Sequence, residues 1–441
     1  MSRKPTIIMV LLAVFLTAIT YYVLQNNKSA PKTQTTPGLS PNSISLLKIE
    51  WSDGRHFSAV RSKNGNTSRW LQTEPVNYPL RTDTMNDLIL ALCSCSNIQY
   101  SEQPVNKTIT AKPQAIIDTG TTRIELIRRT IAGRALVRID GKVYTTDDQL
   151  FKLIAENDPV AWRSRKVFDN LNVDISRITL ISHDGKIIKL ARLRGKWHIT
   201  EPIGCTADEK SISKILAAII DARVQSFIAD NPENLADFGL QYPTLLVFVE
   251  LDKRTLGADG KVQTNTVSQT LAIGNTADVE GNLRYADRKD RNVIFTVTRS
   301  LLNTLAASVR NLADKHACAV NPTDIAAIKV TTSRSELKLK RKVEGWSYEG
   351  NTSSSGRSAS DTATELINLL TQQIADDIIL PEEEADTDNS ESNKQLTVEL
   401  LAYDGGPLAE LLISATDDNK IRVEDTTNHL VRTYPGSIQI D

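Results

Sequence analysis

The chain begins with one long apolar stretch and continues as short segments in which apolar and polar residues alternate. Residues 7–24 read IIMVLLAVFLTAITYYVL and contain no charged residue. A helix of this length rises about 27 Å, which matches the hydrocarbon core of a bilayer. The stretch predicts a transmembrane helix, with a cleaved signal peptide as the alternative. We expect a short cytoplasmic head at 1–6, and a flexible stalk at 25–44 that carries the body outside the cytoplasm.

Beyond the stalk, the clearest pattern lies in the middle of the chain. Residues 176–182, 187–193 and 195–201 alternate, which predicts three short strands. A helix should follow, with residues 206–209 (TADE) as its capping box. Four more strands, near 244–251, 269–274, 282–286 and 293–297, and a helix over 300–314 should complete the unit. The apolar face of the first helix should pack on a core; it consists of Ile212, Ile215, Leu216, Ile219 and Ile220.

The same order of segments occurs on both sides of this middle copy. Trp70, Trp197 and Trp346 each lie on the strand just ahead of a helix, where an indole most simply packs against that helix. We therefore predict three tandem modules at 45–168, 169–320 and 321–441. Strands grouped before and after helices indicate an α+β fold with mostly antiparallel sheets. The flanking helices present Met85, Leu88, Ile89 and Leu92 in the first copy, and Ala363, Leu366, Ile367, Leu370 and Ile374 in the third.

Composition narrows the possible partners. Lysine plus arginine (52) nearly equals aspartate plus glutamate (53), so the net charge is -1. A nucleic-acid-binding domain usually carries a basic excess, so we expect no nucleic-acid partner. Five histidines and four cysteines leave little material for a metal site.

One segment of the middle module is distinctive. Residues 227–243 read FIADNPENLADFGLQYP, between GKWHITEP at 195–202 and the later LAIG at 271–274, Arg284-Tyr285 and VIF at 293–295. Together they resemble a bacterial family known as domain of unknown function 4340. The resemblance is good over 170–315, fair over 45–168 and weak after 320. By itself, the glycine in this segment needs only a structural role, as a helix C-cap.

The resemblance implies a setting but no activity. Members of that family look like this chain, with one N-terminal anchor followed by copies of such a module. The resemblance implies a bacterial envelope protein. Together with the orientation expected for the N-terminal helix, this predicts a protein of the inner membrane with its body in the periplasm. It also implies proximity to an ABC-type export system related to gliding-motility machinery. It implies no cofactor and no site residues.

The residues themselves lead us to assign no catalytic, cofactor-binding or metal-binding position, since no fingerprint of such a site occurs. His183 and His198, on neighbouring strands, are the residues that an unrecognised hydrolase would use. Cys93 and Cys95 most simply pack at a helix end. Cys205 and Cys318 flank the middle module and could form a disulfide in an oxidising periplasm.

Charged stretches and turns complete the pattern. Residues 163–166 (RSRK) form the densest basic cluster, expected to be a solvated join between modules, or else a contact with a neighbouring subunit or anionic lipid. Arg310 is expected at the matching place in the middle module. The acidic residues 382–391 read as a mobile insertion. Hairpin turns are expected at the Asp-Gly pairs of Asp140, Asp184, Asp259 and Asp404.

These features favour a non-enzymatic protein. The leading hypothesis is a membrane-anchored accessory or scaffold subunit of an envelope complex, with ABC-type transporter subunits as its partners. The alternative is a module that binds a periplasmic polymer or a lipid through its sheets or its module joints.

Overall fold

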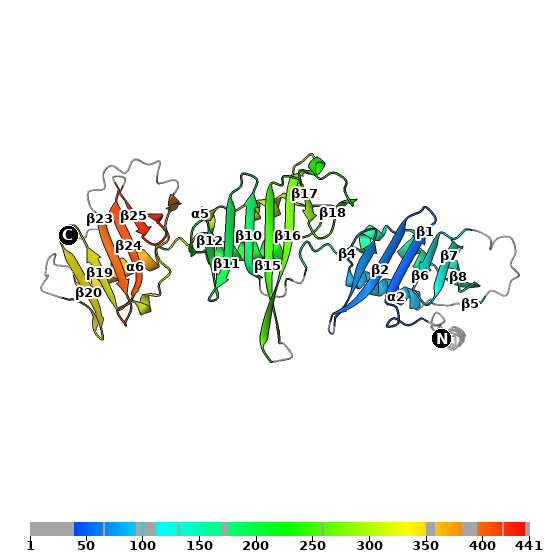
Figure 1. The fold of residues 1–441 in the computed structure, drawn as a ribbon, viewed down its shortest axis with the longest axis horizontal. Coiled ribbons are helices and arrows are strands. Elements are labelled where there is room, and N and C mark those ends of the chain that lie inside the picture. The colour runs from blue at the N-terminus through cyan, green and yellow to red at the C-terminus, as the bar shows by residue number, and fades with distance from the viewer. Residues whose placement is uncertain are drawn as a thin grey trace, which may run out of the picture. The chain divides into compact units, whose positions relative to one another are not determined.

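The computed structural model describes residues 39–64, 67–93, 99–100, 112–130, 133–169, 171, 175–256, 260–349, 358–381, 395–416 and 419–436. The predicted head and membrane helix, and most of the predicted stalk, lie outside these residues. Within the described part of the chain, no helix combines the length and the apolar character needed to cross a membrane. The described residues form three sheets with accompanying helices (Figure 1).

The first sheet has nine strands in the order β4-β3-β2-β1-β6-β7-β8-β9-β5. Helix α2 (Thr82–Cys93) follows the fourth strand, and the short helices η2 (Phe151–Ala155) and η3 (Pro159–Trp162) follow the last. The strands are β1 (Leu46–Trp51), β2 (His56–Asn64), β3 (Thr67–Glu74), β4 (Tyr78–Pro79), β5 (Gln99–Tyr100), β6 (Ala115–Asp118), β7 (Arg123–Arg129), β8 (Arg134–Ile139) and β9 (Lys142–Asp147).

The second sheet also has nine strands, in the order β13-β12-β11-β10-β15-β16-β17-β18-β14. Its helices are α3 (Glu209–Ile220), η4 (Ala236–Phe238), α4 (Arg299–Leu305) and α5 (Val309–Leu312). The strands are β10 (Ile175–Ser182), β11 (Ile187–Leu193), β12 (Lys196–Glu201), β13 (Cys205–Thr206), β14 (Phe227–Asp230), β15 (Leu245–Leu256), β16 (Val262–Thr276), β17 (Leu283–Arg288) and β18 (Val293–Thr298).

The third sheet has eight strands, in the order β21-β20-β19-β23-β24-β25-β26-β22. Its helices are η5 (Pro322–Asp324) and α6 (Ala359–Thr371). The strands are β19 (Ala327–Thr331), β20 (Glu336–Lys342), β21 (Gly345–Tyr348), β22 (Asp377–Ile379), β23 (Gln395–Leu401), β24 (Pro407–Ala415), β25 (Lys420–Asp425) and β26 (Leu430–Pro435).

The three sheets repeat one topology. In each, the first strand pairs with the second on one side and with the second strand after the main helix on the other. The strand that directly follows that helix lies at the far edge of the sheet. Among the described residues, the third sheet keeps the same order of neighbours without an equivalent of β4 and β13; residues 350–357, between β21 and α6, are not described. The prediction of mostly antiparallel sheets is thus confirmed. The residue bounds of the predicted modules remain a prediction.

Each sheet buries one face against its own helix. In β15 alternate residues are buried, from Leu245 through Val247 and Val249 to Leu251, as expected for a strand with one face on a core. They pack in one cluster with buried residues of α3, such as Ile215. Helices α2 and α6 belong to the corresponding clusters of the first and third sheets. The predicted apolar faces therefore do cover the sheets.

Two apolar residues were wrongly placed on those faces. Ile220 is the last residue of α3 and is 49% exposed. Ile374 is 61% exposed and lies beyond the end of α6 at Thr371. In both cases the helix ends before the next turn would carry the side chain back to the core.

The predicted capping box of α3 is also wrong. Asp208 is the N-cap, and its carboxylate accepts the backbone N–H of Ser211 at 2.7 Å. Thr206 instead lies in β13, where it pairs with His198 of β12. The extra strand shifts the start of the helix two residues along the chain.

The helix predicted over 300–314 consists of two short helices. Helix α4 ends at Leu305 and α5 begins at Val309. Beyond α5 the chain must reach the sheet edge, because Ala313 forms a bridge with Ala207 and the N–H of Asp208 bonds to the carbonyl of Leu312. A continuous helix would carry these groups away from the edge.

The predicted turns are found wherever the structure describes them. Asp140 and Gly141 connect β8 to β9 with φ of 46° and 84°, which suits a two-residue hairpin. Gly185 and Gly405 also have positive φ, in the turns after β10 and β23. Asp259 lies outside the described residues.

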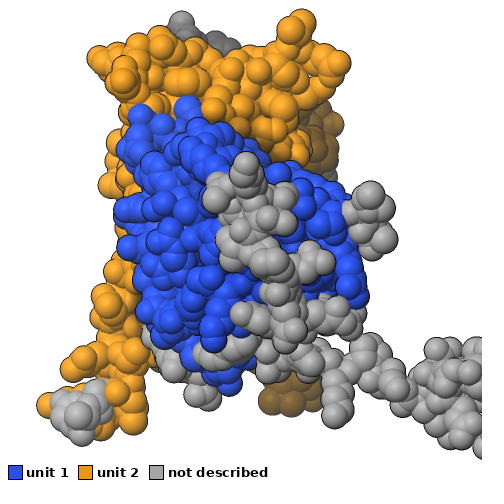
Figure 2. Space-filling model, turned by 90° about the vertical axis from the view of Figure 1, so that its right-hand side faces the viewer, with its two compact units in different colours: residues 1–165, 229–231, 291–293 blue, residues 166–228, 232–290, 294–441 orange. Residues whose placement is uncertain are grey.

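Contacts divide the chain into two compact units, coloured separately in Figure 2. Unit 1 comprises residues 1–165 with the short pieces 229–231 and 291–293. Unit 2 comprises residues 166–228, 232–290 and 294–441, and so contains most of the second sheet and all of the third. Buried Ile378 and Leu430 of the third sheet belong to the core cluster of the second sheet, which explains why these two sheets form one unit.

Strands β15 and β16 extend beyond their neighbours as a two-stranded ribbon (Figure 1). Their pairing continues to Leu256 opposite Val262. These two residues are 76% and 62% exposed. The ribbon therefore carries an apolar pair near its tip.

Candidate functional site

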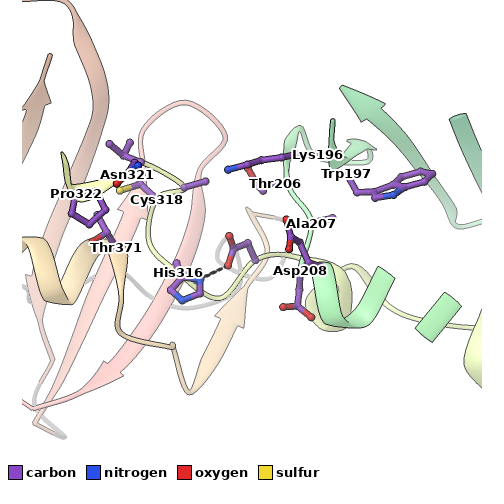
Figure 3. Close-up of a pocket in the computed structure, with 14 residues that line it drawn as sticks. Lys196, Trp197, Thr206, Ala207, Asp208, His316, Cys318, Asn321, Pro322 and Thr371 are labelled. Atoms are coloured by element: carbon purple, nitrogen blue, oxygen red, sulfur yellow. Dashed lines mark hydrogen bonds and ion pairs between the residues drawn. The ribbon is translucent and has the colours of Figure 1, made fainter. Parts of the chain in front are cut away.

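A groove lies between the second and third sheets, within unit 2. Its volume is about 450 Å³. One side is the edge of the second sheet at β12 and β13 with the start of α3, and it contributes Lys196, Trp197 and Asp208 (Figure 3). The other side is the connection to the third sheet with the end of α6, and it contributes His316 and Cys318. The groove is thus formed by the joint between two sheets.

His316 is held in a fixed orientation in this groove. Its Nδ1 lies 2.6 Å from Oδ1 of Asp314, and its backbone N–H donates to the same oxygen at 3.0 Å. The imidazole remains 37% exposed. A histidine oriented by a carboxylate can act as a general base when a nucleophile lies within reach. The nucleophile to consider here is Cys318.

Cys318 is not activated as a nucleophile. Its Sγ donates to the carbonyl of Leu370 at 3.5 Å, and burial raises the pKa of the thiol to about 11. Only the thiolate is nucleophilic, so this thiol stays protonated at neutral pH. Burial also raises the pKa of the Cys205 thiol to about 11. The groove therefore lacks an activated thiol nucleophile, and its residues are better suited to binding a partner or to connecting the two sheets.

The hypothesised disulfide between Cys205 and Cys318 is not formed, since both residues are free thiols in the structure. Cys205 is buried as a small apolar side chain, and Cys318 is partly buried and donates to the carbonyl of Leu370. Cys93 is buried at the end of α2, as the helix-packing interpretation predicted. Cys95 lies outside the described residues.

A buried arginine fastens the joint. Arg432 of β26 is 4% exposed; its Nε donates to the carbonyl of Asp314 at 2.9 Å and an Nη donates to the carbonyl of Ala317 at 3.3 Å. The hydroxyl of Tyr434 donates to the carbonyl of Lys315 at 3.2 Å, and burial raises the pKa of this tyrosine above its usual range. Strand β26 thereby holds the chain segment that enters the third sheet.

The second sheet holds its own entering segment in a similar way. Arg288 of β17 is 2% exposed, and an Nη donates to the carbonyl of Val167 at 2.9 Å and to Oε1 of Gln269 at 2.6 Å. The side chain of Gln269 also pairs with both backbone groups of Asp169, at 2.9 and 2.7 Å. Both sheets of unit 2 therefore use a buried arginine to bind backbone carbonyls of the preceding connection.

The first residue of the basic cluster at 163–166 is not solvated, so that interpretation is wrong for Arg163. This residue is 1% exposed and forms a bidentate pair with Asp230 at 2.6 and 2.7 Å. Its Nε donates to Oε1 of Gln72 at 2.9 Å, and its guanidinium lies 5.5 Å from the ring centroid of Tyr78. Arg291 lies 4.7 Å from the same ring. All five residues belong to unit 1.

The expected match between this cluster and Arg310 is also wrong. Arg163 forms a bridge with Leu80, and Ala313 forms the equivalent bridge with Ala207. Arg310 therefore lies three residues before the equivalent position. It is 42% exposed and lies 3.7 Å from Asp377 of β22. The backbone bridge thus occurs in both modules, whereas the residue that forms it is an arginine in the first module and an alanine in the second.

The structure does not bring His183 and His198 together. His183 lies in the turn after β10, whereas His198 pairs with Ala191 of β11, which in turn pairs with Arg177 of β10. Arg177 precedes His183 by six residues, or roughly 20 Å along an extended strand. The two histidines do not form one site.

Each of the three tryptophans faces an arginine across its sheet, a repeat that sequence reasoning missed. Trp70 is paired with Arg61, Trp197 with Arg192, and Trp346 with Arg341. The guanidinium of Arg341 lies 4.9 Å from the ring centroid of Trp346. The available signal was an arginine on the strand before each tryptophan, nine residues ahead of it in the first sheet and five residues ahead in the second and third. The tryptophans do lie on the predicted strands, and only Trp70 is fully buried.

The distinctive segment at 227–243 docks on the second sheet through two glycines. Gly239 has φ of 69° and caps η4, as predicted, and Leu240 is fully buried. A Cβ on Gly274 of β16 would lie 2.3 Å from the carbonyl oxygen of Phe238. Phe238 also meets Tyr285 edge to face, with ring centroids 5.1 Å apart. This segment is therefore part of the folded body.

The remaining candidate stretch, the acidic residues 382–391, lies outside the described residues. No group of three or more potential metal ligands occurs in the part of the chain that the structure describes.

A family model described as domain of unknown function (DUF4340) matches residues 197–425. The match covers the segment at 227–243 and all of the groove lining except Lys196, and it ends before Arg432. Searches of curated proteins and of solved structures give no match.

Proposed function

Because the chain belongs to the DUF4340 family, we propose that it is a non-enzymatic accessory or scaffold protein of a bacterial envelope complex. In this proposal residues 7–24 span the inner membrane and the body extends into the periplasm. Its partners are subunits of an ABC-type transport system related to gliding-motility machinery. The apolar N-terminal stretch and the family resemblance support this setting.

The observation that carries the proposal is the repeated sheet with fastened connections. One topology occurs three times, and buried arginines bind the backbone of the connections into the second and third sheets. Arrays of similar modules offer extended surfaces on which other proteins assemble. A joint held by several hydrogen bonds also keeps those surfaces in constant register within unit 2.

Site-specific photocrosslinking of the full-length protein in intact membranes tests this role. The crosslinkable residue replaces Val279, Val343 or Tyr403, which are 107%, 105% and 70% exposed. We expect mass spectrometry to recover permease or ATPase subunits of a transporter from at least one position. The matched control replaces Val247, which is fully buried and should give no partner. Recovery of this chain alone, or of cell-wall fragments alone, would contradict the proposal.

A further inference from the structure

A second pocket in unit 2 opens into the core of the second sheet. Its volume is about 740 Å³, within the range typical of small-molecule sites. Leu180 and Leu245 line it from the sheet, and Leu305 and Val309 line it from the helices. All four side chains are less than 10% exposed and belong to the core cluster. A ligand in this pocket would therefore contact the apolar interior.

The break between α4 and α5 creates the opening. Helix α4 ends at Leu305, and α5 starts at Val309. The residues between them, Ala306 to Ser308, line the pocket and are all small. A continuous helix with larger side chains would fill this space. The same break that sequence reasoning missed thus provides access to the core.

The ionisable residues of the pocket wall are both cations. Lys186 follows the turn after β10, and Arg310 lies on α5. Each has a carboxylate partner outside the wall: Asp184 at 2.9 Å and Asp377 at 3.7 Å. These ion pairs are between 42% and 83% exposed, so exchanging one carboxylate for another costs little free energy.

We propose that this pocket binds a single-chain amphiphile with a carboxylate head, that is, a long-chain fatty acid. The acyl chain lies against Leu180, Leu245 and Leu305, and the carboxylate pairs with Lys186 or Arg310 in place of an aspartate. The site goes beyond the scaffold role and does not depend on it. It also differs from the sheet surfaces and joints considered from the sequence, because most of its apolar lining belongs to the second core.

Photolabelling tests this site. The full-length protein in lipid nanodiscs is labelled with a diazirine-bearing long-chain fatty acid, and the labelled peptides are mapped by mass spectrometry. We expect saturable labelling of peptides that cover β10 or α4 and α5. The unlabelled fatty acid should compete about tenfold better than its methyl ester, because the ester lacks the charge that pairs with the cations.

Two variants locate the ligand. Ala306→Trp fills the mouth of the pocket and should abolish labelling, whereas Ala217→Trp, at an exposed position of α3, should not. Lys186→Gln with Arg310→Gln should remove the preference for acid over ester. If Ala306→Trp does not fold, the double variant of Lys186 and Arg310 becomes the test of the binding site. Labelling unchanged by Ala306→Trp in a folded protein, equal competition by the ester, or equal competition by a diacyl phospholipid would overturn the proposal.

Discussion

Arg163 shows how much one side chain contributes within unit 1. It is 1% exposed, and it donates hydrogen bonds to the side chains of Asp230 and Gln72. Removing one partner of a buried ion pair leaves the other desolvated and unpaired. Arg163→Met should therefore lower the free energy of unfolding by about 3 kcal/mol. Urea denaturation followed by tryptophan fluorescence measures this change, since Trp51, Trp70 and Trp162 lie in the core of unit 1.

Arg81→Met is the matched control for this prediction. Arg81 pairs with Asp83 at 2.7 Å, but the two side chains are 45% and 66% exposed. An exposed pair contributes about 0–1 kcal/mol. An equal decrease in the free energy of unfolding for the two variants would contradict the prediction that the buried pair stabilises unit 1 more than the exposed pair does.

The raised pKa values of the two free thiols of unit 2 predict how fast these thiols react at a given pH. Burial raises the pKa of both thiols to about 11, from a usual value of 9.0. At pH 8 the thiolate fraction is therefore about a hundredfold lower than in the unfolded chain. We expect iodoacetamide to alkylate Cys205 and Cys318 about a hundredfold more slowly in the native protein than in guanidinium chloride. Fast labelling of the native protein, or protection that persists in denaturant without reductant, would contradict free buried thiols.

The sequence showed which residues are charged but not which of them are buried. Arg163 is surrounded by Ser164, Arg165 and Lys166, so local composition indicated a solvated stretch. Its partner Asp230 is 67 residues away, and no local pattern connects the two. Cys205 and Cys318 were likewise judged from their places along the chain, whereas burial and the lack of a bond between them depend on tertiary structure.

At the scale of elements, neighbouring isoleucines of α3 offer a direct comparison. Ile219 is fully buried, and Ile220 is 49% exposed. Ile219→Ala should lower the free energy of unfolding by about 3 kcal/mol, because it leaves a cavity in the core. Ile220→Ala should change it by less than about 0.5 kcal/mol. Thermal denaturation of both variants measures these changes. A similar loss of stability in the two variants would support the sequence-based prediction that Ile220 also packs on the core.

The docking of the 227–243 segment predicts an effect of one methyl group. Gly274→Ala places a Cβ 2.3 Å from the backbone oxygen of Phe238, so the segment must shift. We expect a loss of about 2 kcal/mol, and faster amide exchange across residues 232–243. In the control, Gly204→Ala, the new Cβ has no neighbour within 4 Å. Unchanged exchange in Gly274→Ala would show that the segment is not held by this contact.

Strands in which apolar and polar residues alternate strongly were predicted correctly. The residues at which helices begin and end were not. The buried residues of β15 at Leu245, Val247 and Val249 follow the period of two that the sequence displays. The start of α3 was misplaced because Thr206 has the side chain of a cap but is used in strand pairing. The end of the helical stretch at Leu312 was misplaced because the next residue, Ala313, forms a bridge with Ala207, more than a hundred residues away. Long-range backbone pairing, invisible to local patterns, decides these boundaries.

At the scale of unit 2, the hydrogen bonds of Arg432 predict the order in which the two sheets unfold when these bonds are removed. Arg432→Met removes the donors to the carbonyls of Asp314 and Ala317, leaving buried acceptors without partners at a cost of about 1–3 kcal/mol each. We expect the third sheet to unfold first, as a separate transition in calorimetry, with proteolysis between residues 313 and 326. Arg334→Met, at an exposed turn, is the control. A single transition at an unchanged temperature in Arg432→Met would contradict the clamp.

The repeat itself was visible in the sequence, but the way its copies combine was not. Alternating segments around three tryptophans predicted three similar copies, and three sheets of one topology are present. The packing of Ile378 and Leu430 into the second core joins two of these sheets in one unit. Both residues have ordinary apolar neighbours in the sequence, so nothing local distinguished a joining residue from a core residue. The groove at the joint was hidden for the same reason.

The arginine network of unit 1 has a consequence for protein synthesis. Asp230 is made 67 residues after Arg163, and at about 5–20 residues per second this delay is roughly 3–13 s. Until then the guanidinium of Arg163 lacks its bidentate pair with Asp230, and the ring of Tyr78 lacks its contact with Arg291, which is made still later. A nascent chain that ends at residue 168 therefore cannot complete its first unit. Folding must be interleaved along the chain, with the first unit finished only when much of the second sheet has been translated.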